Sequence, residues 1–258
     1  MRLREIFKIS KGTKVVLTIT LSVSIIAVVF AFFYYRDLNR LEDPRINKAR
    51  ELLARYDMLS GGINSFNHFS YLDSAYAIFS SYPDYKSSFE TGLICNNKCS
   101  AFLMIALYDS TISMSEKNNL LELSLKYCDS SITIYRKWIS EWGNLSYASV
   151  AQKLKPYMTE THPSFRGLNF KRIFDRRIRN IVTAQIETPR RLSVSLSNKG
   201  TIHRHLMDTE SAFNYYREAL VLWPENRAAE SNLSVLMGGK PVKVSMVESL
   251  FPPDKNKK

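Results

Sequence analysis

A single uncharged stretch near the N-terminus constrains this chain most strongly. Residues 15–35 contain no charged residue, no glycine and no proline. As an α-helix this stretch is about 31 Å long, which matches the hydrocarbon core of a bilayer. Its four hydroxyl side chains can bond to carbonyls of the same helix, so they add little cost in lipid. The stretch therefore predicts one transmembrane helix.

A cleaved signal peptide is the alternative reading of the same stretch. The apolar run is longer than the core of a typical signal peptide, and no clear cleavage site with small residues follows it. It ends in four aromatic residues, 32–35, which are typical of a membrane interface. The first cysteine is Cys95, too far along the chain for a lipid anchor. We therefore expect the helix to remain as the anchor.

The orientation of this helix does not follow from counting basic residues. Five Lys and Arg residues precede the stretch, and five follow it within residues 36–50. A short basic tail is hard to translocate, whereas a long domain crosses largely regardless of its charge. We therefore expect residues 1–14 to be cytoplasmic. In a bacterium the protein would then be a single-pass inner-membrane protein with a periplasmic body.

The composition beyond the anchor is that of a folded domain. The chain is 45% hydrophobic and 12% aromatic, which excludes a disordered or low-complexity protein. Its net charge of +12 is accompanied by no nucleic-acid-binding motif, so no nucleic-acid partner is expected. Three cysteines are too few for a disulfide scaffold, and we interpret them as buried structural residues. Because the number is odd, an oxidising compartment would leave at least one cysteine free or paired with another molecule.

Hydrophobic residues in region 36–192 recur at helical spacing, and no alternating strand pattern competes. Asp43 and Pro44 are typical of a helix start, and glycines at 61 and 62 of its end. The pattern then predicts helices over 66–79, two short ones around 89–94 and 101–108, one over 115–142, one before Pro156 and one over 168–187. The fold class predicted for the chain is all-α.

The most specific motif lies in residues 193–224, where small and aromatic residues recur at fixed spacing across two predicted helices. Its packing residues are Leu196, Gly200 and His203 on the first helix, Ala212, Tyr216 and Ala219 on the second, and Pro224 after it. This spacing resembles one tetratricopeptide repeat (TPR). The resemblance implies that Gly200 and Ala212 let the helices approach closely. Lys199 and His203 depart from the residues that the family favours there.

The resemblance also implies an architecture, because one helix pair cannot bury its faces alone. A helix over 226–237 would cap the repeat, so that 193–237 forms a repeat plus a capping helix. Region 36–192 would supply degenerate TPR-like hairpins, and the whole would be a TPR-like helical-hairpin solenoid behind a single N-terminal transmembrane helix. The chain is similar to membrane-anchored TPR proteins that help assemble bacterial envelope machines, including periplasmic flagellar motor collars.

Two surfaces are candidates for partner binding. The helix over 168–187 carries an outer basic face, which suits an acidic protein, an anionic lipid surface or a cell-wall polymer, or is simply a solvated helix face. The TPR resemblance implies a second surface, the groove lined by first helices. The candidate residues are Lys171, Arg172, Arg176 and Arg179 on the basic face and Asn198, Arg204 and Asn232 in the groove.

The sequence contains no recognised catalytic, nucleotide-binding or metal-binding motif. His203 and His205 are two positions apart and would point to different sides of a helix. We therefore expect no cofactor, no metal and no enzymatic activity. The leading hypothesis is a membrane-anchored scaffold that binds other envelope proteins, with homo-oligomers within a larger assembly as an open alternative. The rival hypothesis is an envelope enzyme or cell-wall-binding module whose helices position a substrate or a catalytic partner.

The C-terminal tail, residues 238–258, ends in a basic run and contains three prolines, so we expect it to be mostly extended. Its apolar residues are too many for a simple linker. Packing on its own domain and binding of a partner both remain open for this segment.

Overall fold

The computed structural model describes residues 11–59 and 68–242, without side chains at 34–40. Every regular element in these ranges is a helix, which confirms the all-α prediction. The predicted tails fall largely outside the description, at 1–10 and 243–258. The helices are α1 (Lys11–Arg40), η1 (Pro44–Ile46), α2 (Asn47–Leu59), α3 (Phe69–Ser80), α4 (Phe89–Tyr108), α5 (Met114–Trp142), α6 (Tyr147–Leu154), η3 (Pro163–Phe165), α7 (Phe170–His205), α8 (Thr209–Leu222) and α9 (Arg227–Leu236).

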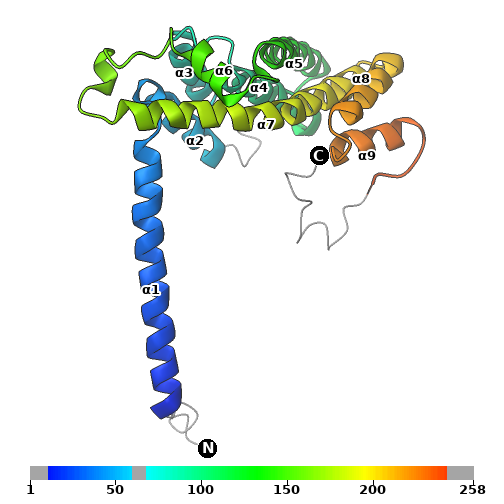
Figure 1. The fold of residues 1–258 in the computed structure, drawn as a ribbon. Helices are drawn as coiled ribbons and strands as arrows, with labels where there is room; N and C mark the ends of the chain where they lie inside the picture. Colours follow the sequence, from blue (N-terminus) through cyan, green and yellow to red (C-terminus); the bar gives the residue numbers. More distant parts are fainter. Residues whose placement is uncertain (1–10, 60–67, 243–258) are drawn as a thin grey trace, which may run out of the picture.

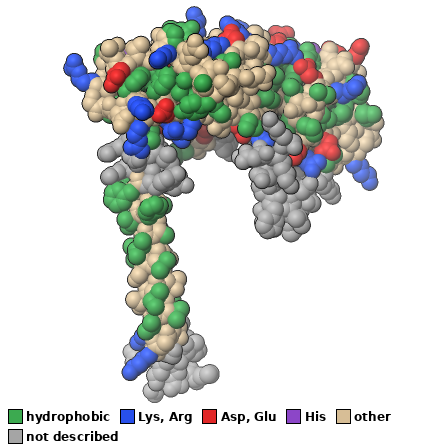
Figure 2. Space-filling model, viewed as in Figure 1, with side chains coloured by type: hydrophobic (Ala, Val, Ile, Leu, Met, Phe, Trp, Pro, Cys, Tyr) green, Lys and Arg blue, Asp and Glu red, His purple; other side chains and the backbone are tan. Residues whose placement is uncertain are grey.

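Helix α1 stands away from the rest of the molecule (Figure 1). Its segment Lys11–Phe33 is long and apolar enough to cross a membrane, and no part of its most apolar stretch is buried against the body. Figure 2 shows hydrophobic side chains along this rod and charged side chains spread over the body. A helix with exposed apolar residues all round is unstable in water, whereas lipid would cover it.

Local capping explains where several body helices begin. Ser113 and Glu116 form a capping box at the start of α5, each side chain bonding the other residue's backbone N–H. Asp208 caps α8 by accepting from the backbone of Ser211, and Asn226 caps α9 in the same way. These starts agree with the predicted helices within a few residues.

Two predicted helix breaks are wrong. The two short helices expected between 89 and 108 form one continuous helix, α4. The predicted break between 187 and 193 is also missing, because α7 runs for 36 residues with Pro189 inside it. Proline removes one backbone donor, but the buried face of α7 continues past it through Leu192 and Leu196. The boundary between regions 36–192 and 193–237 therefore lies inside a helix.

Helix α7 is the longest element of the body and runs across it, whereas α1 extends away from the body (Figure 1). It packs against α4, α5, α6, α8 and α9. On one part of its length Ile173, Ile178 and Ile181 join a core with Trp138 and Trp142 of α5. Further along, it forms a hairpin with α8. Because α7 contributes both to this core and to the hairpin with α8, it joins the two parts of the body.

The three cysteines are buried, as expected, and Cys99 of α4 forms a disulfide with Cys128 of α5, a pairing that the sequence left open. The Cα atoms of the pair are 5.2 Å apart, within the usual range for a disulfide. Cys95 remains a free, buried cysteine. The bond covalently joins α4 to α5.

Candidate functional site: a cleft between α2, α4 and α7

A buried ion cluster joins the segment that follows α1 to the body. Asp43 caps η1, and its carboxylate accepts from Arg45 at 2.7 Å. The same guanidinium donates to Asp84 at 2.8 Å and to the carbonyl of Tyr157 at 3.0 Å. The side chains of Arg45, Asp43 and Asp84 are at most 2% exposed. Burial raises the pKa of Asp84, and the positive charge of Arg45 partly offsets that rise.

A second buried pair extends this cluster to α4 and α7. Arg177 of α7 pairs with Glu90 of α4, and its guanidinium lies 4.0 Å from the ring centre of Tyr85. The Tyr85 hydroxyl donates to Asp43 at 3.1 Å. Burial raises the pKa of Tyr85 well above its usual value, so this hydroxyl keeps its proton. Residues 43–45, which follow α1, are thus held by hydrogen bonds from two other parts of the body, residues 84–85 and Tyr157.

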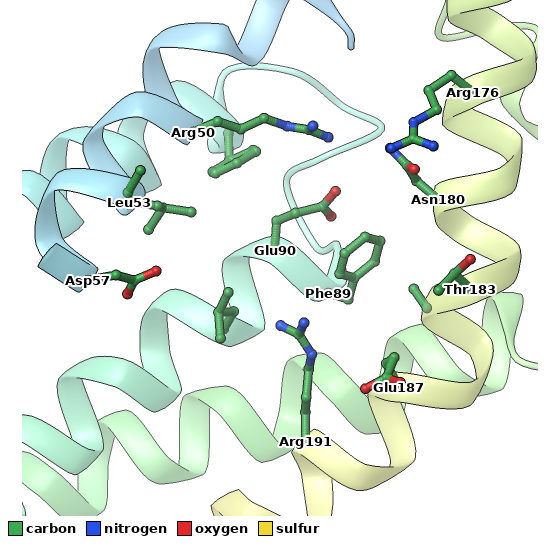
Figure 3. A pocket seen from close by; sticks show the side chains of 14 residues that line it. Arg50, Leu53, Asp57, Phe89, Glu90, Arg176, Asn180, Thr183, Glu187 and Arg191 are labelled. Atoms are coloured by element: carbon green, nitrogen blue, oxygen red, sulfur yellow. The ribbon is translucent and has the colours of Figure 1, made fainter. Parts of the chain in front are cut away.

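Next to this cluster lies an open cleft of about 660 Å³ between α2, α4 and α7 (Figure 3). This volume is within the range of ligand pockets in proteins. Its lining combines apolar side chains with charged and polar ones. The apolar lining residues are Leu53, Ala54, Phe79, Phe89, Leu93 and Ala184, and the polar ones are Arg50, Asp57, Glu90, Arg176, Asn180, Thr183, Glu187 and Arg191.

The mouth of the cleft is bridged by an ion triad. Arg50 of α2 and Arg176 of α7 reach toward one another in Figure 3. Both pair with Glu42, which follows α1 closely; the distance from Arg176 Nε to Glu42 Oε1 is 3.3 Å. The triad of two arginines and one glutamate carries a net positive charge close to the end of α1. Of the residues predicted for the basic face, Arg176 therefore belongs to the cleft.

Two further charged side chains point into the cleft. Glu90 and Arg191 both line it, and Figure 3 shows the Arg191 guanidinium directed toward the space beside Phe89. Asp57 lies at the α2 wall, and burial raises the pKa of its carboxyl group. The cleft can therefore offer an apolar surface together with groups of both charges.

The other predicted basic residues lie apart from the cleft lining. Lys171, Arg172 and Arg179 are exposed on α7. Arg179 lies near the ring hydroxyl of Tyr147 on α6, and its charge lowers the pKa of that hydroxyl, which burial and Asp175 raise overall. The structure thus splits the predicted basic face into one cleft residue and three surface residues.

The predicted groove residues take part in contacts between helices. The side-chain amide of Asn198 donates to Asn96 of α4 at 3.4 Å, and that of Asn232 donates to Thr201 of α7 at 3.3 Å. Arg204 is half-buried near the end of α7. Asn198 and Asn232 therefore serve packing between helices in this structure.

The predicted packing residues gather in the α7–α8 hairpin. Leu196, Ala212, Tyr216 and Ala219 are fully buried. Gly200 faces Tyr216 so closely that a Cβ would lie 2.7 Å from the ring. Two remaining members lie at helix ends: His203 Nδ1 is 3.0 Å from Asp208 Oδ2, and Pro224 follows the extended Trp223 at the end of α8.

Sequence reasoning missed both the buried ion cluster and the cleft. Their members come from segments far apart in the chain, as Arg177 and Glu90 illustrate with a separation of 87 positions. One part of the ion cluster that is local in sequence is Asp43, Pro44 and Arg45. From the sequence alone, Asp43 and Pro44 indicate a helix start and not an ion cluster. A similar glycine contact was also missed, since a Cβ on Gly92 would lie 2.5 Å from the Tyr135 ring.

Comparison with known proteins gives no significant match to any protein-family model, curated protein or solved structure.

Proposed function

We propose that this protein is a membrane-anchored scaffold that binds a polypeptide partner in the cleft between α2, α4 and α7. The cleft is the observation that carries the proposal, because its lining combines apolar side chains with charged groups of both signs. Apolar surface supplies binding energy, and a few placed polar groups supply orientation and specificity. The anchor would confine the search for a partner to the plane of the membrane.

The disulfide supports placing the body on the oxidising side of the membrane. Disulfides persist in the periplasm and outside cells and are rare in the cytosol. Both cysteines of the pair are buried in the contact between α4 and α5, so the bond belongs to the folded core. This agrees with the expected orientation, in which residues 1–14 are cytoplasmic and the body lies in the bacterial periplasm.

The α7–α8 hairpin with α9 supports a TPR-like character for the C-terminal part. Gly200, Ala212 and Tyr216 meet as the resemblance implies. Upstream the likeness is weaker, because the α4–α5 hairpin covers residues 89–142 and exceeds the unit of about 34 residues that defines the repeat. The proposed class is therefore an envelope scaffold with one TPR-like unit, such as would help assemble or stabilise a larger complex, flagellar motors included.

Affinity capture from native membranes tests this proposal. Thr183 is exposed at the cleft wall, so Thr183→Trp would fill the cleft with little effect on the core. We expect this variant to lose the proteins that co-purify with the wild type. Ala148→Trp, at an exposed position of α6, is the matched control and should retain them.

A triple variant separates the exposed basic face from the cleft. Lys171→Glu, Arg172→Glu and Arg179→Glu together reverse its charge without touching the cleft lining. We expect unchanged recovery of partners. Loss of partners in this variant and full recovery with Thr183→Trp would contradict the cleft as the binding site and favour the basic face.

A further inference from the structure

Glu90, which lines the cleft, has one carboxylate oxygen without a hydrogen-bond partner among the described residues. Its Oε1 atom accepts from Arg177, whereas Oε2 is buried and has no hydrogen-bond partner within the described ranges. The side chain is only 10% exposed. A buried acceptor without a partner is costly, so a donor that enters the cleft would be favoured there.

Arg191 offers the cleft a positive charge with free N–H donors. It forms no ion pair with any carboxylate in the part of the chain that the structure describes, although it lies near the buried Tyr135. Burial raises the pKa of Tyr135, and the nearby Arg191 charge partly offsets this. A guanidinium has five N–H donors, so one phenolic neighbour leaves most of them available. Figure 3 shows this group pointing into the cleft.

The third feature of the cleft is an apolar surface beside Glu90 and Arg191. Phe89 and Leu93 of α4 and Leu53 of α2 line the same space as Glu90 and Arg191. A ligand that satisfies all three features has an N–H donor, an apolar side chain and an anionic group. The last residue of a polypeptide carries these on one Cα atom: its amide N–H, its side chain and its free carboxylate.

We propose that the cleft captures the free C-terminal residue of a partner polypeptide, and that this residue is apolar. The partner's amide N–H donates to Glu90 Oε2, its carboxylate binds Arg191, and its side chain lies on Leu53, Phe89 and Leu93. An internal peptide segment would offer Arg191 only a neutral carbonyl, which makes a weaker hydrogen bond than a carboxylate. The inference rests on the proposed function and names the chemistry of the partner.

A pair of peptides tests the inference with the full-length protein in detergent. The probe is fluorescein-labelled Ser-Gly-Ser-Gly-Leu, prepared as the free acid and as the C-terminal amide, and binding is followed by fluorescence anisotropy. We expect the acid to bind at least about tenfold more tightly than the amide. Arg191→Gln should bring the acid to the level of the amide. Arg190→Gln, which alters the neighbouring arginine outside the cleft lining, should preserve the difference.

The outcomes separate this inference from the proposed function. Equal binding of acid and amide would overturn C-terminal capture while leaving a protein-binding cleft in place. Absence of binding by either peptide up to about 1 mM would also overturn it, since specific recognition gives lower Kd values. A third arm uses a fluorescent phosphatidylethanolamine as the probe, since this lipid carries both charges on one headgroup. If vesicles of unlabelled phosphatidylethanolamine displace that probe from the protein and the peptides do not, the ligand is lipid and the inference fails.

Discussion

At the scale of single residues, the α7–α8 hairpin depends on the absence of a side chain. A Cβ on Gly200 would lie 2.7 Å from Tyr216 Cε1 and 3.2 Å from the Ala212 carbonyl oxygen. Since Tyr216 is fully buried, its ring has no free space to move into. We expect Gly200→Ala to lower the free energy of unfolding by about 1–3 kcal/mol in chemical denaturation. Asn214→Ala, exposed on α8, is the control, and equal stability of both variants would contradict the contact.

Arg45 is the residue whose loss should damage the junction most. Arg45→Met leaves the buried carboxylates of Asp43 and Asp84 without their cation. Breaking a buried pair in this way costs about 3–5 kcal/mol of unfolding free energy. Arg50→Met is the matched control, because its side chain is 32% exposed and its pair with Glu42 is worth at most about 1 kcal/mol. A similar loss in both variants, measured by urea titration, would refute the special role of Arg45.

The free thiol of Cys95 should be unreactive in the folded protein. Burial raises its pKa to about 11, and the Lys98 charge offsets only part of this rise. The raised pKa means that the unfolded chain loses this proton first, so stability falls as pH rises from about 9 toward 11. We expect iodoacetamide at pH 8 to modify Cys95 only after unfolding, as read by mass spectrometry. The loss of stability between about pH 9 and 11 should be smaller in Cys95→Ala than in the wild type, the remainder coming from buried tyrosines such as Tyr85 and Tyr135.

At the scale of elements, the Cys99–Cys128 bond holds α4 and α5 together across a separation of 29 residues. A disulfide that closes a loop of this length stabilises a protein by about 3–4 kcal/mol. We therefore expect a reductant to lower the Tm of the wild type and to leave the Cys99→Ala, Cys128→Ala double variant unchanged. Protein alkylated under denaturing conditions without reductant should carry one adduct, at Cys95. Three adducts in material taken directly from native membranes would contradict an oxidising location.

Elements that begin or end through local chemistry could be predicted from sequence. The apolar spacing over 115–142 predicts α5, and Pro224 marks the end of α8, so both helices could be predicted within a few residues. The Ser113 and Glu116 capping box is a further local signal at the start of α5. The continuity of α7 could not be predicted in this way. Pro189 is typical of a helix end, and only the packing of α7 against α5 and α8 outweighs its missing donor.

At the scale of the whole molecule, the long apolar N-terminal helix and the all-α body could be predicted from sequence, but the cleft could not. Residues 15–35 are apolar along their whole length, a property that needs no tertiary information. The cleft needs three helices to meet, and its residues at 50–57, 89–93 and 176–191 share no motif. Arg176 was predicted as part of an exposed basic face because helical spacing alone does not show that α2 lies opposite.

Site-specific photocrosslinking in native membranes tests the central claim, that the anchored body takes a polypeptide in this cleft. A photoreactive phenylalanine at Ala54, exposed on the α2 wall, would report what enters the cleft, and the same residue at Asn214 on α8 serves as control. We predict a discrete polypeptide adduct from position 54 that is lost with Thr183→Trp and absent from position 214. No adduct at position 54, or identical adducts at both positions, would contradict the account.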